Sequence, residues 1–102
     1  MNYKEVNTKK EYNNLLNELS IESKILAVKY PEISIYKSIY NQIGDIQSMI
    51  HNNIKLSEND IYKKYSIGAI AVKNFDCEKD IFGRKLQDLF GALFEYWNMP
   101  ES

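Results

Sequence analysis

Residues 65–76 read Tyr-Ser-Ile-Gly-Ala-Ile-Ala-Val-Lys-Asn-Phe-Asp and form the longest low-charge run of small and apolar residues in the chain. Ser57, followed by Glu58 and Asp60, places a capping hydroxyl and two acids at the positive end of a helix dipole. We therefore predict a helix over residues 58–73, buried on most sides because its residues are small. The alternative is a buried strand, since β-branched residues favour strands, but no second strand-like run exists to pair with it.

A long helix is predicted upstream, over residues 8–29. Thr8 and Glu11 have the spacing of a capping box, in which each side chain accepts a hydrogen bond from the other residue's backbone. Apolar residues then recur every three or four positions, which is typical of a helix with one buried face. The pattern slips between Ser20 and Ser23 and resumes at Ile25, which predicts either a kink or a shift of the buried face.

Tyr30-Pro31 separates this helix from the next one, because a residue before proline is driven away from helical angles. The second helix is predicted over residues 32–52, with an apolar seam at positions 36, 39, 43, 46 and 50 that suits antiparallel packing against the first. Gly44 interrupts it at a cost of about 1 kcal/mol relative to alanine. We expect Gly44 to allow close approach of another backbone.

The last helix is predicted over residues 78–97, after a loop at 75–79. Asp80 is placed to cap it, and Asp76 is an alternative start. The chain therefore reads as an all-α, single-domain bundle of about four helices that spans residues 1–102.

Composition excludes several function classes. Lys and Arg total 13 and Asp and Glu total 14, so the chain lacks the basic surface of a nucleic-acid binder or of a membrane-surface protein. No apolar run approaches the roughly 20 residues of a membrane span. The start lacks the features of a signal peptide, and Cys77 is the single cysteine, so we expect a cytoplasmic, reduced protein.

No catalytic, cofactor or metal motif is present. The chain has no Gly-rich phosphate loop and no zinc spacing. Its one histidine, His51, is expected at a surface or helix end, and acidic neighbours disfavour Cys77 as a nucleophile. We expect no enzymatic activity and no cofactor or metal.

The densest acidic group is Asp76, Glu78 and Asp80. It has two interpretations: a solvated loop with a helix cap, or an acidic patch that faces a basic partner. The residues alone leave both open.

A family resemblance lies in the opening stretch. Residues 68–76, Gly-Ala-Ile-Ala-Val-Lys-Asn-Phe-Asp, resemble the Gly-x-Ile-Ala-Val-Lys-x-Phe-Asp run of type VI secretion immunity proteins that neutralise NAD(P)+ glycohydrolase effectors. The break at residues 29–31 and the Leu-Gln-Asp at 86–88 resemble segments at similar places in that family. The chain departs from the family at Asn74, where the family has Glu, and in the aromatic residues of its last helix, Phe90, Phe94 and Trp97.

The resemblance implies a non-enzymatic helical inhibitor that binds a cognate toxin domain and occludes its active site. The toxin would be an NAD(P)+ glycohydrolase or, second, a nuclease, delivered by type VI or contact-dependent machinery. The candidate contact residues are Asp76, Glu78, Asp80, Lys73, Asn74 and Phe75. We expect reversal of the three acids to spare the fold and to weaken toxin binding.

The alternative is a helical adaptor that forms a homodimer through its aromatic last helix. The sequence leaves open whether the chain is a monomer or a homodimer.

Overall fold

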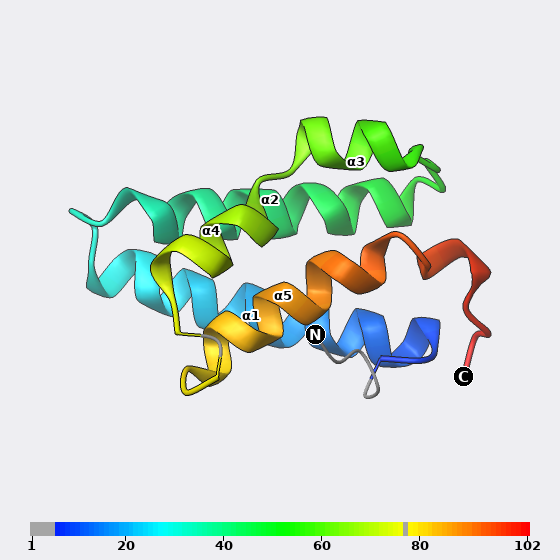
Figure 1. Ribbon diagram of the computed structural model, residues 1–102. Coiled ribbons are helices and arrows are strands. Elements are labelled where there is room, and N and C mark those ends of the chain that lie inside the picture. The colour runs from blue at the N-terminus through cyan, green and yellow to red at the C-terminus, as the bar shows by residue number, and fades with distance from the viewer. Residues whose placement is uncertain (1–5, 77) are drawn as a thin grey trace.

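A computed structural model describes residues 6–76 and 78–102, and the part of the chain that it describes is helical without strands (Figure 1). The elements are α1 (Lys9–Lys29), α2 (Ser34–His51), α3 (Glu58–Lys64), α4 (Ile67–Asn74), α5 (Ile81–Leu93) and the 3-10 turn η1 (Tyr96–Asn98). The all-α prediction is confirmed, but the number of helices was wrong, because residues 6–76 and 78–102 form five α-helices where about four were expected. Cys77 lies outside the described residues.

Helices α1 and α2 form an antiparallel hairpin, and α5 lies across α1 with α4 packed on it (Figure 1). Helix α3 runs beside the second half of α2, where Lys64 Nζ lies 3.3 Å from Asp45 Oδ2. The core between these layers holds fully buried aliphatic side chains from α1, α2 and α5: Leu16, Leu19, Ile39, Ile43, Ile46, Leu86 and Leu89. The predicted seam of α2 is thus confirmed at its centre.

Helix α1 begins as its sequence predicts. Thr8 Oγ1 accepts a hydrogen bond from the Glu11 N–H at 3.1 Å, and Glu11 Oε1 accepts from the Thr8 N–H at 3.1 Å. The helix continues through Ser20 without a break, and its buried face does not shift. Ser23 occupies the buried stripe, while Ile25 is left outside.

The predicted helix over 58–73 is wrong, because the chain leaves helical geometry at Tyr65 and Ser66. Tyr65 is extended, with φ −120° and ψ 132°, and its buried hydroxyl donates to Asp45 Oδ2 at 2.6 Å. Burial, followed by this hydrogen bond to a carboxylate, raises the pKa of Tyr65 well above its ordinary value. The anchored tyrosine separates α3 from α4.

Helix α5 is shorter than the predicted 78–97. Asp80 caps it as expected, with Oδ1 accepting from the Gly83 N–H at 3.2 Å. It ends at Leu93, and the chain then turns through η1 towards the start of α1. There the carbonyls of Pro100 and Glu101 accept from the N–H groups of Lys9 and Lys10, at 2.8 and 3.1 Å. These two amides begin α1 and have no partner within the helix, so the C-terminal segment satisfies them.

Gly44 does not serve close approach of another backbone, contrary to the sequence-based expectation. A Cβ atom built on it would meet nothing within 4 Å, and the residue is exposed. Glycine therefore costs α2 conformational entropy without any packing benefit.

Replacing Gly44 with alanine should raise the free energy of unfolding by about 1 kcal/mol, the difference between the two residues inside a helix. Chemical denaturation followed by circular dichroism measures this change. An unchanged or lowered midpoint would contradict the open environment of Gly44.

No helix among residues 6–76 and 78–102 is long and apolar enough to cross a membrane.

Candidate functional site: the α4 face

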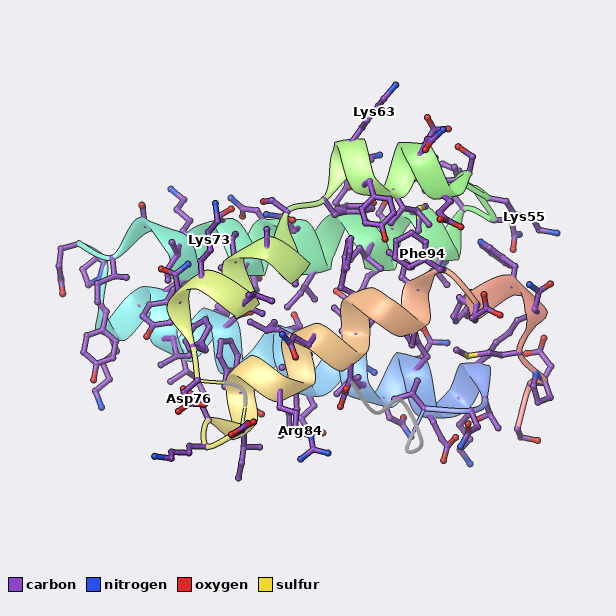
Figure 2. The ribbon with its side chains drawn as sticks, in the orientation of Figure 1. Lys55, Lys63, Lys73, Asp76, Arg84 and Phe94 are labelled. Atoms are coloured by element: carbon purple, nitrogen blue, oxygen red, sulfur yellow. The ribbon has the colours of Figure 1, made fainter. Side chains whose placement is uncertain are left out.

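The structure brings the six predicted contact residues together at the end of α4 and in the loop before α5. Figure 2 shows Lys73 near the end of α4 and Asp76 in the loop that follows. The side chains of Lys73, Asn74, Asp76 and Glu78 are exposed, whereas those of Phe75 and Asp80 are partly buried.

Two of the three acids have structural roles. Asp80 caps α5, and Asp76 Oδ1 accepts from the Glu78 N–H at 3.2 Å, while the Asp76 carbonyl accepts from the Lys79 and Asp80 N–H groups at 2.9 and 2.6 Å. Reversing either charge removes a hydrogen bond that shapes the loop or starts a helix, at a typical cost of about 1 kcal/mol for a helix cap. The expectation that all three acids can be reversed without effect on the fold is therefore revised. Glu78 is the acid best suited to such a test.

Phe75 is a packing residue. Its ring centroid lies 5.6 Å from that of Phe82, edge to face, and 6.5 Å from that of Tyr36. It closes the core beneath the loop, so its side chain offers a partner little surface. Asn74 Nδ2 donates to the Ile70 carbonyl at 3.0 Å, near the end of α4.

An apolar groove of about 440 Å³ lies beside these residues, between α3, α4 and α5. Its lining consists of aromatic, small and aliphatic side chains with two polar ones: Tyr62, Gly68, Ala69, Val72, Lys73, Gln87, Phe90 and Gly91. Lys73 belongs to both the groove and the predicted contact set, so groove and loop form one continuous surface. We call it the α4 face.

The groove corrects the interpretation of residues 68–72 as a buried central helix. Ile67 and Ala71 are buried, but Val72 is 65% exposed and Ala69 is exposed as well. Helix α4 therefore packs through one side and presents the other to solvent. Tyr62, 61% exposed, borders the groove from α3.

Aromatic contacts hold the walls of the groove. The ring centroid of Tyr62 lies 5.8 Å from that of Phe90 and 4.9 Å from that of Phe94. Figure 2 shows Phe94 at the end of α5, below α3. The sequence alone does not place Tyr62 at the groove, because the groove is formed by three helices that are separate in the chain.

Gln42 of α2 positions α4. Its Oε1 accepts from the N–H groups of Ser66 and Ile67, at 2.8 and 3.1 Å, and its Nε2 donates to Ser66 Oγ at 3.0 Å. The side chain of Ser66 makes no capping hydrogen bond to its own helix. A side chain from another helix thus satisfies the first amides of α4.

Gln42→Ala should lower the free energy of unfolding by about 1–2 kcal/mol, because α4 loses the three hydrogen bonds that cap it, and a fourth bond, from Gln42 Nε2 to Ser38 Oγ at 3.1 Å, is lost within α2. Gln47→Ala is the matched control on the same helix, since Gln47 makes a single exposed bond to Asn17 Oδ1 at 3.1 Å. Urea denaturation of both variants compares them. Equal losses would mean that Gln42 does not cap α4.

The α4 face suits the binding of a protein surface. Its groove is apolar and open, and the exposed carboxylate of Glu78 lies in the loop that follows α4. Among the described residues, no group of three or more His, Cys, Asp and Glu side chains could hold a metal ion. His51, the last residue of α2, is exposed.

Comparison with known proteins identifies the family. A search of curated proteins and a search of solved structures each returned no match. The family model Tsi6 matches residues 11–95, which include all five α-helices except the first two residues of α1. The chain therefore belongs to the Tsi6 family of type VI secretion immunity proteins.

Proposed function

We propose that this protein neutralises a secreted NAD(P)+ glycohydrolase-type toxin by docking its α4 face over the toxin's active site. Family membership supports the immunity role, and the likeness of residues 68–76 to the motif of such inhibitors supports the class of toxin. The chain acts as a binding protein, not as an enzyme, and its partner is the toxin domain.

The observation that carries the choice of surface is the groove beside the acidic loop. Val72 and Tyr62 present apolar area that a protruding toxin side chain covers, and Glu78 lies beyond the end of the same helix. Buried apolar anchors supply most of the affinity of a protein interface. Acidic groups opposite a basic substrate pocket speed association and add specificity.

A rigid surface favours tight inhibition. Helix α4 is held by Gln42 at its start and by the packing of Phe75 at its end. A preformed surface loses little conformational entropy on docking, so more of the contact energy appears as affinity.

Co-expression tests the function. A toxin gene found beside this one should, when expressed alone, arrest growth and deplete cellular NAD(P)+, and co-expression of this protein should restore both. If the toxin degrades nucleic acid instead, the immunity role stands and the glycohydrolase assignment is wrong. If co-expression does not protect the cells, the adaptor alternative replaces the immunity role.

Glu78→Lys should slow association with the toxin several-fold and make the association rate less sensitive to salt, because a steering charge is reversed. Stopped-flow mixing at two ionic strengths measures both effects. Glu95→Lys is the control, since Glu95 is an exposed acid beyond the opposite end of α5. Equal association rates for Glu78→Lys and Glu95→Lys would remove the loop from the contact surface.

A further inference from the structure

In the second half of α1, a polar residue lies on the side that faces the core and three apolar residues lie on the side that faces solvent. Ser23 is fully buried on the stripe that faces the core. Ile21, Ile25 and Val28 are 62%, 59% and 72% exposed on the opposite side of the helix. We call these three residues the α1 outer face. A contiguous exposed apolar patch on a small domain is typical of an interaction surface.

The spacing of the outer face suits helix pairing. Steps of four and then three residues place Ile21, Ile25 and Val28 on one seam, as in a coiled coil. Ile25 also borders a groove of about 380 Å³ beside Phe82, and Ile81, the first residue of α5, is 71% exposed.

We propose that the α1 outer face binds a second copy of this chain, with the two α1 helices antiparallel across a two-fold axis near Ile25. In a two-fold interface the same patch of each copy must be complementary to itself. Glu22 and Lys29 are seven residues apart, so they lie on the same edge of the seam. Antiparallel pairing centred on Ile25 places Glu22 of one copy within one residue of the level of Lys29 of the other, and the pair occurs twice.

This charge pattern favours a second copy over a toxin. A basic toxin cleft requires acids alone, whereas one edge of this seam carries both signs in an order that antiparallel pairing matches, and the other edge carries Lys24. Glu22 is held at the edge by Lys85, whose Nζ donates to its Oε1 at 3.0 Å. The groove of the α4 face is built by α3, α4 and α5, so it stays open in such a dimer.

The dimer should be weak and reversible. Stable interfaces bury about 800 Å² per partner, more than three aliphatic side chains provide. Sedimentation of the full chain over a concentration series should therefore follow a monomer–dimer equilibrium. A chain that remains monomeric at the highest concentration would overturn the proposal.

Ile25→Glu should raise the dimer dissociation constant by roughly tenfold or more, since a charge would be buried at the two-fold axis. Ile54→Glu is the matched control, because Ile54 is 47% exposed in the loop after α2. Circular dichroism should show that both variants keep the native helix content. If both substitutions weaken the dimer equally, the interface does not lie at Ile25. If the wild type is monomeric and Ile25→Glu weakens toxin binding, the α1 outer face binds the toxin and not a second copy.

A charge swap tests the antiparallel arrangement. Lys29→Glu should weaken the dimer, because it sets two carboxylates against each other at both ends of the seam. Adding Glu22→Lys should restore the affinity, while Glu18 remains to pair with Lys85. Failure of the double variant to recover would rule out this pairing.

Discussion

Replacing Gly68 with leucine should lower the free energy of unfolding by about 1–3 kcal/mol or more, the range for forcing a side chain against one already in place. A glycine inside a helix ordinarily costs about 1 kcal/mol relative to alanine, so a larger residue would be expected to help. Here the sign reverses, because a Cβ atom on Gly68 would lie 2.6 Å from Cδ2 of Phe90. Alanine could be accommodated by a shift of the half-buried ring, whereas the branched side chain of leucine fills the space into which the ring would move.

Ala69→Leu is the matched control, since Ala69 is the next residue of α4 and is exposed. It should leave the unfolding midpoint near that of the wild type. Combining Gly68→Leu with Phe90→Ala should cost less than the sum of the single changes, because the smaller residue removes the clash. Additive losses in urea denaturation would mean that Phe90 is not the obstacle.

Features that depend on residues close together in the chain could be predicted. The pairs Thr8–Glu11 and Asp80–Gly83 each span three residues, and both form the expected capping hydrogen bonds. Ser57 likewise accepts from the Asp60 N–H. The periods of α2 and of the first half of α1 identified their core faces for the same reason, since helical geometry fixes which neighbours share a side.

Features that depend on distant residues could not be predicted. The break between α3 and α4 is made by Asp45, which binds Tyr65, and by Gln42, which caps the next helix. Gly44 and Gly68 have similar surroundings in the sequence, yet one faces open space and the other an aromatic ring. Only the packing of α4 on α5 distinguishes them.

In the candidate site, too, features that depend on nearby residues could be predicted and features that depend on distant residues could not. The acidic group could be identified from the sequence, because its three acids lie close together in the chain. That Asp76 and Asp80 serve the loop and the helix cap, while Glu78 remains exposed, follows from the geometry of the turn. The groove escaped detection because residues 68–72 were expected inside the bundle, although Val72 faces out.

Val72→Glu should weaken toxin binding by about 2 kcal/mol or more, roughly 30-fold in the dissociation constant, which is the level of an interface hot spot. In the proposed complex the Val72 side chain is covered by an apolar toxin group, so a carboxylate there would be buried in the groove without a partner. The fold should be unaffected, because Val72 lies on the solvent side of α4. Titration calorimetry or surface plasmon resonance with the toxin domain measures the loss.

Val28→Glu provides the control, since it makes the same change at an exposed helical position that is 72% accessible on α1. Toxin binding measured at low protein concentration, where the chain is monomeric, should not be changed by Val28→Glu.

If Val28→Glu weakens toxin binding while Val72→Glu does not, the toxin docks on α1 and the assignment of the α4 face is wrong. If neither does, but Glu78→Lys still slows association, the contact is confined to the loop and the groove is not part of it. If Val72→Glu lowers the affinity and Glu78→Lys slows association, one toxin surface must cover both residues. Their positions are compatible with this, because Val72 lies on α4 and Glu78 lies in the loop that follows the same helix.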